Sequence, residues 1–222
     1  MPNDGTDRSC AKASSPFHGS DSTQMAPLQP ADVGQWRKSE RERLIRERQA
    51  ITSEQRHKWD EQIGRVLCQF LAELHGAILS IYWPFRGEPD LRFLLPELRA
   101  NYLTIALPVV VEKGRPLQFR EWKEGDQLER GVWNIPIPAE SKVVRPDIVL
   151  APVVGFDRAA YRLGYGGGFF DRTLPTLDPS ARAFGVGYSQ TELPTVHPQP
   201  YDIPMSAIVT ESGVTKPPVC AA

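Results

Sequence analysis

The segment Asp147-Ile-Val-Leu-Ala-Pro-Val-Val154 decides the fold class, because it is an uncharged apolar run that leads into a glycine-rich segment. A run of this kind is typical of a strand buried on both faces. Similar runs occupy residues 77–83, 103–111, 183–188 and 207–210, and helical patterns lie between several of them. The alternation predicts an α/β fold with a mostly parallel central sheet, covered by helices on both faces. Ligands of such sheets bind at the carboxyl ends of the strands.

Two helices are expected before the first strand. Asp32 can cap the first helix, and Thr52 with Gln55 has the capping-box spacing that starts a second, amphipathic helix. Eight basic and four acidic residues lie from Arg37 to Lys58. Such a charge run is typical of a solvated helix face, although the basic residues at its start could close over phosphates.

The glycine-rich segment reads Arg162-Leu-Gly-Tyr-Gly-Gly-Gly-Phe-Phe-Asp-Arg172. Glycine permits positive φ and close backbone approach, so successive N–H groups can form an anion-binding concavity ahead of a helix, with Arg162 as a fixed positive charge. The segment is not a Walker A motif and lacks the last glycine of GxGxxG. Two interpretations stay open, a phosphate-binding loop and a tight structural turn. For Asp171, a salt bridge or helix cap competes with a magnesium ligand.

A third candidate segment, Tyr82-Trp-Pro-Phe-Arg-Gly-Glu-Pro-Asp90, follows the first strand directly. Its aromatic side chains could stack on a flat heterocycle, and Glu88 could accept hydrogen bonds from the edge of that ring. The alternative is an aromatic plug of the core followed by the cap of the next helix. Taken alone, Asp202 fits a turn carboxylate.

Composition excludes several classes of protein. The 222 residues include 26 Lys plus Arg and 27 Asp plus Glu, a formal net charge of −1, whereas nucleic-acid binders usually carry a strongly basic face. No apolar run reaches the roughly 18 residues of a membrane span. The three cysteines and four histidines are scattered, so neither a disulfide framework nor a zinc site is expected. We therefore expect a protein of the reducing cytoplasm that binds neither nucleic acid nor membrane.

The composition also predicts the domain boundaries. Residues 1–30 are rich in Ser, Asp, Gly, Pro and Thr, which indicates a disordered leader. A single domain is expected over residues 31–215, followed by a short tail at residues 216–222.

From about Trp36 to Glu211 the chain resembles the 5-formyltetrahydrofolate cyclo-ligase (methenyltetrahydrofolate synthetase) family. That family shows Pro-Gly-x-x-Phe-Asp and then Arg-Leu-Gly-x-Gly-x-Gly-Tyr-Tyr-Asp. This chain has Val154-Gly155-Phe-Asp and then the glycine-rich segment quoted above. Further pieces of the resemblance are Trp133-Asn-Ile-Pro, Gly-Glu-Pro-Asp at 87–90, and the early basic helix.

The resemblance implies a three-layer α/β sandwich like those of ribose-phosphate isomerases and CoA transferases. It implies ATP-dependent conversion of 5-formyltetrahydrofolate to 5,10-methenyltetrahydrofolate, with release of ADP and phosphate. The formyl oxygen would be phosphorylated and N10 of the folate would then attack the activated carbon. The implied partner is a small folate, the implied cofactors are ATP and Mg²⁺, and the expected state is a monomer or weak homodimer.

Site residues carry over by position. The catalytic positions would be Arg162 and Tyr165. The ATP-binding positions would be Arg37, Lys38, Arg41, Arg162, Leu163, Gly164, Tyr165, Gly166, Gly167, Gly168, Phe169 and Phe170, with the choice between Arg37 and Lys38 open. The substrate-binding positions would be Arg41, Trp83, Glu88 and Tyr165. The magnesium positions would be Asp171 and Asp202.

The chain departs from the family pattern at several of these places. Phe169 and Phe170 replace paired tyrosines, Pro89 replaces valine beside Glu88, and Gly167 stands where some members carry lysine. These changes leave two alternatives to the cyclo-ligase reaction. One is a paralogue that binds ATP and acts on another ligand, and the other is a non-catalytic nucleotide-binding regulator.

Overall fold

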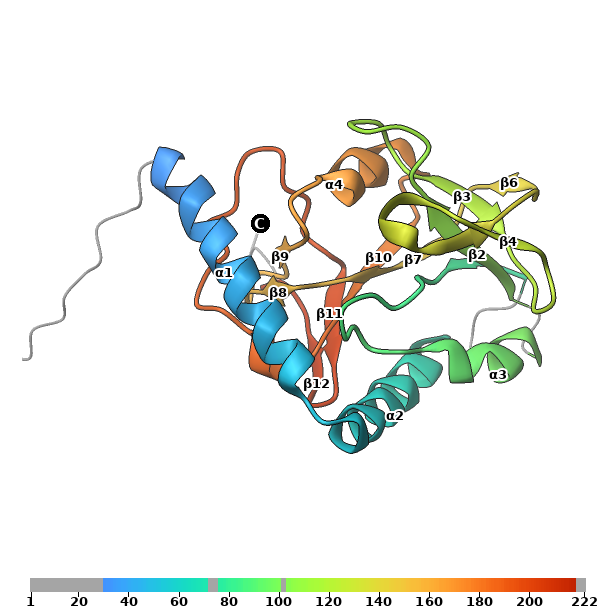
Figure 1. Cartoon of the computed structure of the whole chain (residues 1–222), viewed down its shortest axis with the longest axis horizontal. Helices are drawn as coiled ribbons and strands as arrows, with labels where there is room; N and C mark the ends of the chain where they lie inside the picture. Colours follow the sequence, from blue (N-terminus) through green and yellow to red (C-terminus); the bar gives the residue numbers. More distant parts are fainter. Residues whose placement is uncertain (1–29, 72–75, 101–102, 219–222) are drawn as a thin grey trace, which may run out of the picture.

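An eight-stranded sheet forms the centre of the computed structural model, which describes residues 30–71, 76–100 and 103–218 (Figure 1). In spatial order its strands are β12 (Gly213–Thr215), β11 (Ala207–Thr210), β10 (Arg182–Val186), β7 (Ile148–Pro152), β1 (Ile78–Ser80), β2 (Thr104–Val109), β3 (Gln118–Glu121) and β6 (Val143–Val144). The five neighbours β11, β10, β7, β1 and β2 run parallel. At the edges, β12 and β3 run antiparallel to them, and β6 pairs antiparallel with β3. The expected mostly parallel sheet is therefore confirmed.

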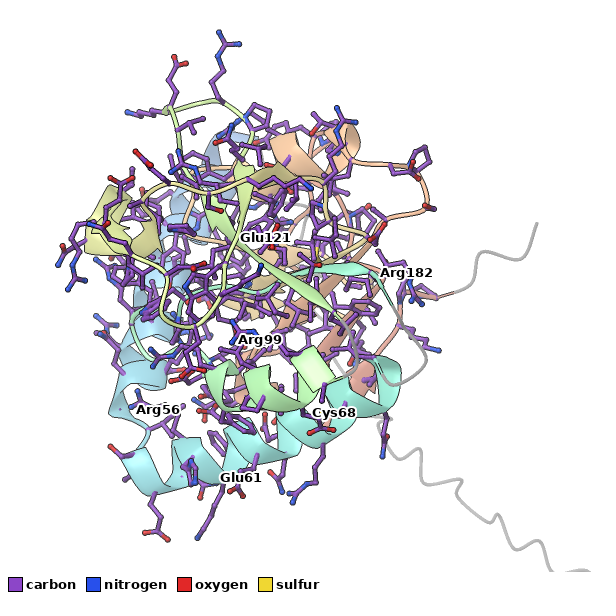
Figure 2. The ribbon with its side chains drawn as sticks, turned by 90° about the vertical axis from the view of Figure 1, so that its right-hand side faces the viewer. Arg56, Glu61, Cys68, Arg99, Glu121 and Arg182 are labelled. Atoms are coloured by element: carbon purple, nitrogen blue, oxygen red, sulfur yellow. The ribbon has the colours of Figure 1, made fainter. Side chains whose placement is uncertain are left out.

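Alternation along β7 builds two separate cores. Ile148 and Leu150 belong to the cluster beneath α2 (Ser53–Leu71) and α3 (Leu95–Ala100), which the short turn η1 (Arg92–Leu94) precedes. Val149 and Ala151 point to the opposite face. Figure 2 shows α2 along one side of the molecule, with Arg56, Glu61 and Cys68 on it.

The opposite face of the sheet is covered by α4 (Phe169–Thr173) and the turn η3 (Leu174–Thr176), whose apolar side chains join Val149 and Ala151. Helical layers thus lie on both faces of the sheet, which confirms the three-layer sandwich.

Helix α1 (Pro30–Ala50) crosses the end of these layers, where Leu44 packs with Val154 and Leu163. It begins at Pro30, so Asp32 lies in its first turn instead of capping it. Arg37 and Arg48 are buried. The interpretation of the charge run as a solvated face is therefore wrong for this inner face of the helix.

Two small hairpins flank the carboxyl edge of the sheet (Figure 1). The first pairs β4 (Leu128–Arg130) with β5 (Pro136–Pro138) across the turn η2 (Val132–Asn134). The second pairs β8 (Gly155–Phe156) with β9 (Arg162–Leu163) and leads from β7 into the glycine-rich segment. A further turn, η4 (Ser189–Thr191), follows β10.

The leader expected at residues 1–30 lies outside the described residues, apart from Pro30. The last strand ends at Thr215, directly before the predicted tail of residues 216–222. None of the helices in the described ranges is long and apolar enough to cross a membrane. Cys68 is a free thiol, and the other two cysteines are not among the described residues.

Candidate active site

A cavity of about 460 Å³ opens where β1, β2 and β7 end, a size typical of small-molecule sites. Residues that follow β1, the end of β2 and the glycine-rich segment after β7 supply its walls. The cavity brings together every site residue expected from the sequence except Lys38, which is exposed on α1. Of the two residues between which the sequence left the choice open, Arg37 lines the cavity and Lys38 does not.

The glycine-rich segment curls tightly over the cavity. Gly166 and Gly168 have φ of 90° and 61°, in the left-handed region that favours glycine, whereas Gly164 and Gly167 lie outside it. The helix that follows has only five residues, so the macrodipole expected to strengthen an anion site is small. A tight turn explains two of the four glycines, and the charge around the segment has to come from side chains.

Two arginines in the cavity are paired with carboxylates. Arg162 donates two hydrogen bonds to Asp171, at 3.0 and 3.1 Å, and Asp171 also accepts the backbone N–H of Ile203. Arg37 makes a salt bridge with Asp202. For Asp171 the sequence left a salt bridge or helix cap and a magnesium ligand open, and for Asp202 taken alone it favoured a turn carboxylate. Both side chains pair with arginines.

The same carboxylates retain a limited capacity for a cation. Asp171 accepts three hydrogen bonds, and Asp202 accepts the two N–H groups of Arg37 and that of Gln199. An ionised carboxylate offers about four lone-pair sites, so each keeps about one. In residues 30–71, 76–100 and 103–218 no three His, Cys, Asp or Glu side chains cluster as a metal cage. This donor set fits a magnesium ion held mainly by phosphates and water.

A hydrogen-bond chain links Arg48, Tyr165 and Glu88 at the other end of the cavity. Nη2 of Arg48 donates to Oη of Tyr165 at 2.5 Å, and that hydroxyl donates to Oε1 of Glu88 at 2.8 Å. The N–H of Phe85 donates to Oε2 of Glu88. Arg48 also donates to the carbonyls of Arg86 and Val153 and is 1% exposed. Glu88 is therefore a buried, firmly oriented acceptor in the cavity wall.

Burial raises the pKa of Glu88 to about 7, against an ordinary value of 4.5. Arg48 and the hydrogen bond from Tyr165 oppose this shift, because both favour the carboxylate. Burial raises the pKa of Tyr165 well above its ordinary value, so this hydroxyl stays a donor at neutral pH.

The raised pKa predicts a pH dependence of stability. The folded protein keeps a proton on Glu88 between pH 4.5 and 7 that the unfolded chain has released. This contribution, about 3 kcal/mol, is full below pH 4.5 and is lost as the pH rises through 7. Between pH 4.5 and 8, the free energy of unfolding measured with urea should fall by that much more for the wild type than for Glu88→Gln. Asp60, whose pKa burial raises to about 6, contributes equally to both proteins. Parallel pH curves would contradict the expectation.

A wall of aromatic side chains lies beside the hydrogen-bonded residues Arg48, Tyr165 and Glu88. The rings of Phe85 and Trp133 stack at 6.2 Å and 7°, and Tyr165 and Phe169 lie about as close to Trp133. Trp133 is 49% exposed and, like Asn134, has positive φ. Sequence reasoning did not place Trp133 in the site. The available signal was its segment, Trp-Asn-Ile-Pro, which counted only as part of a resemblance.

Arg48 was also missed. It lies on one face of α1 with Arg37, Arg41 and Leu44, at steps of four, three and four residues. That spacing is typical of the buried face of a helix. The buried face of a helix is usually predicted from regularly spaced apolar residues, and here arginines occupy most of those positions.

The model of the 5-formyltetrahydrofolate cyclo-ligase family matches residues 33–211, most of the chain and all of the cavity wall. The chain belongs to this family. The resemblance stated from the sequence is thus confirmed. Among curated proteins, the 5-formyltetrahydrofolate cyclo-ligase of Escherichia coli K12 is 29% identical over 183 residues, which cover 77% of this chain and 98% of that one.

Solved structures agree with the family membership. A 5,10-methenyltetrahydrofolate synthetase from Aquifex aeolicus is 26% identical, with a TM-score of 0.66, covering 81% of this chain and 92% of the other. One from Mycoplasma pneumoniae is 22% identical with the same TM-score, covering 79% and 98%, and supports the cyclo-ligase fold alone. The sandwich described above is therefore the fold of this family.

Proposed function

We propose that the chain catalyses ATP-dependent conversion of 5-formyltetrahydrofolate to 5,10-methenyltetrahydrofolate, with release of ADP and phosphate. One observation carries the proposal, which is that two chemically different ligand sites share one cavity. Arginines and the glycine-rich segment line one part, and a buried acceptor with aromatic rings lines the other. A transfer of phosphate between two substrates needs this adjacency, because positioning and charge stabilisation supply most of its catalysis.

In the folate part, Glu88 accepts hydrogen bonds from the donor edge of the pterin. Trp83 and the wall of Phe85 and Trp133 cover the flat ring. Tyr165 belongs to the glycine-rich segment, and its hydroxyl donates to Glu88, so it connects that segment to the folate part. We infer that Tyr165 positions the formyl group against the phosphate chain.

In the nucleotide part, Arg37, Arg41 and Arg162 are held in place before any ligand arrives. Arg41 donates to the carbonyl of Gly164 at 2.7 Å, and Arg162 is held by Asp171. Burial, with the like charge of Arg37, lowers the pKa of Arg41. We infer that Arg41 and Arg162 bind phosphate oxygens, and that Arg162 stabilises the charge that develops during transfer. The residues from Leu163 to Phe170 form the floor under the phosphates.

Mg²⁺, when bound with the nucleotide, neutralises phosphate charge. Asp171 and Asp202 would hold it through their remaining lone pairs, while each keeps its arginine oriented. Each carboxylate would then serve both as a magnesium ligand and as the partner of an arginine, so the two roles are compatible.

The scattered cysteines favour a reducing cytoplasm as the place of action. We propose a monomer or weak homodimer.

A paralogue that acts on another ligand is the second candidate. The departures that motivated it have limited reach, since Pro89 is buried outside the cavity lining, and its carbonyl accepts the hydroxyl of Tyr82. Phe170 packs in the core and against Arg162. Only Phe169 removes a hydroxyl beside the aromatic wall. We therefore favour the cyclo-ligase reaction.

The test is an assay of the purified chain with 5-formyltetrahydrofolate, ATP and Mg²⁺, in which absorbance follows the methenyl product. Product should form only when all three are present, and chelation of Mg²⁺ with excess EDTA should reduce the rate by at least about 100-fold, since the phosphate charge is then unscreened. Absence of product at high enzyme concentration, with ATP binding intact by calorimetry, would favour the second candidate.

A further inference from the structure

Charge in the nucleotide part is distributed unevenly among its arginines. Four arginines line the cavity, and carboxylates neutralise Arg37 and Arg162. Among the residues that the structure describes, neither Arg41 nor Arg172 has a carboxylate oxygen within 4 Å. Arg41 and Arg172 are therefore the two cavity arginines without a close carboxylate partner.

Arg172 lies directly against the glycine-rich segment. Its Nη2 donates to the carbonyl of Gly167, and a Cβ at Gly168 would lie 2.8 Å from its Nη1. Its Cζ is 5.4 Å from the centre of the Phe169 ring. The guanidinium is thus held over the second half of the segment by a stacked ring and a carbonyl, before any ligand binds.

The guanidinium of Arg172 has unused donors. A guanidinium offers five N–H groups, and one of them is used on Gly167. Nε is buried and has no hydrogen-bond partner in the described part of the chain. A buried charged donor without a partner is unfavourable, and a bound anion would remove that penalty.

Arg41 stands in the same relation to the first half of the segment. It donates to the carbonyl of Gly164, and a Cβ at Gly166 would lie 3.4 Å from its Cζ. The backbone from Gly164 to Gly168 therefore runs between two arginines that have no carboxylate partner. An anion that extends along this backbone would contact both.

We propose that Arg172 binds the phosphate chain of the nucleotide. It does so at the second half of the glycine-rich segment, whereas Arg41 lies at the first half. The proposal rests on the proposed function and adds to it a residue that neither the motif nor the comparisons assign. A polyphosphate recovers the unused donors of Arg172, and its charge is balanced by Arg41 and Arg172 without breaking either arginine–carboxylate pair.

The test compares Arg172→Gln with wild type by calorimetry, using MgATP and inorganic tripolyphosphate as separate probes. We expect Kd to rise at least about tenfold for both, the usual effect of losing one charged hydrogen bond. The KM for 5-formyltetrahydrofolate should stay within about twofold, because the contacts of Arg172 are with Gly167 and Phe169, whereas those of Glu88 are with Phe85, Arg48 and Tyr165. The matched control is Arg182→Gln, which removes an exposed arginine 5.8 Å from the ring of Phe184 (labelled in Figure 2). Arg182 begins β10, at the opposite end of the parallel strands from the cavity, and does not line it. Unchanged affinity of Arg172→Gln for both probes would overturn the proposal.

A charge relocation separates phosphate binding from a structural role. The three atoms nearest to a Cβ at Gly167 all belong to the ring of Phe169, which can move, and the φ of Gly167 is not left-handed. Gly167→Lys combined with Arg172→Gln should therefore restore at least about threefold of the lost affinity for tripolyphosphate. If Arg172→Gln lowered the melting temperature and Gly167→Lys did not restore tripolyphosphate affinity, Arg172 would have a structural role, which would overturn the proposal. Wild-type protein that binds MgATP without forming methenyl product would contradict the proposed function alone, since the tripolyphosphate comparison still stands.

Discussion

Replacing Glu88 by glutamine should nearly abolish turnover of 5-formyltetrahydrofolate while MgATP still binds. In the wild type, the hydroxyl of Tyr165 holds Oε1 of Glu88 and the N–H of Phe85 holds Oε2. The amide keeps the size of the side chain but replaces one of these two acceptor oxygens with a donor, which would face the donor edge of the pterin. Loss of a charged, buried hydrogen bond and creation of an unpaired donor together cost about 3–4 kcal/mol, or about 100- to 1000-fold in kcat/KM. Steady-state kinetics at pH 8, where Glu88 is mostly ionised, measure this loss.

The control for Glu88→Gln is Glu61→Gln, the same change at an exposed carboxylate of α2 that faces His57 (Figure 2). It should leave turnover unchanged. Calorimetry should find the Kd for MgATP within about threefold of wild type in Glu88→Gln, because the arginines of the nucleotide part do not contact Glu88. An equal loss of folate turnover and nucleotide binding would mean that Glu88 acts as a structural residue of the whole cavity.

Replacing Arg48 by methionine should give the largest loss of stability. The change leaves the carbonyls of Arg86 and Val153 and the hydroxyl of Tyr165 without their donor, and removes the cation 3.9 Å from Glu88. Breaking a buried ion pair by removing one partner costs about 3–5 kcal/mol. Arg48 lowers the pKa of Glu88, so in the variant Glu88 should stay protonated to higher pH. The loss in the free energy of unfolding, relative to wild type, should therefore be larger at pH 8 than at pH 5. Urea unfolding at the two pH values measures both effects.

The matched control on the same helix is Arg46→Met, which removes an exposed arginine and should change the free energy of unfolding by less than about 0.5 kcal/mol. Adding Glu88→Gln to Arg48→Met should recover part of the loss, because the unpaired carboxylate is then gone. If the two substitutions were additive at pH 8, the Arg48–Glu88 interaction would contribute nothing to folding.

Much of the fold could be predicted from sequence because it depends on patterns over short stretches. The apolar run ending in Val154 identified the central strand, and the spacing of Thr52 and Gln55 marked the start of a helix, where the N–H of Gln55 does bond to Oγ1 of Thr52. The composite motif of the glycine-rich segment indicated the family, and its residues do line the cavity.

The partners of the charged residues could not be predicted in this way. Asp171 and Asp202 could each bind a metal ion or pair with an arginine. The outcome depends on which side chains the fold brings beside them, and these lie up to 165 residues away in sequence. Arg172 looked like a flanking charge. Only the structure shows that, of the four described arginines that line the cavity, it and Arg41 have no carboxylate oxygen within 4 Å.

Sequence by itself determined the family, the succession of sheet-forming segments along the chain and the glycine-rich loop that lines the cavity, since each is encoded by neighbouring residues. Tertiary structure alone decided which face of α1 is buried, and therefore that Arg48 lies under Glu88. The reason is that burial of a charge is stable only when several distant acceptors converge on it, as the carbonyls of Arg86 and Val153 and the hydroxyl of Tyr165 do here. A local sequence pattern contains no record of that convergence.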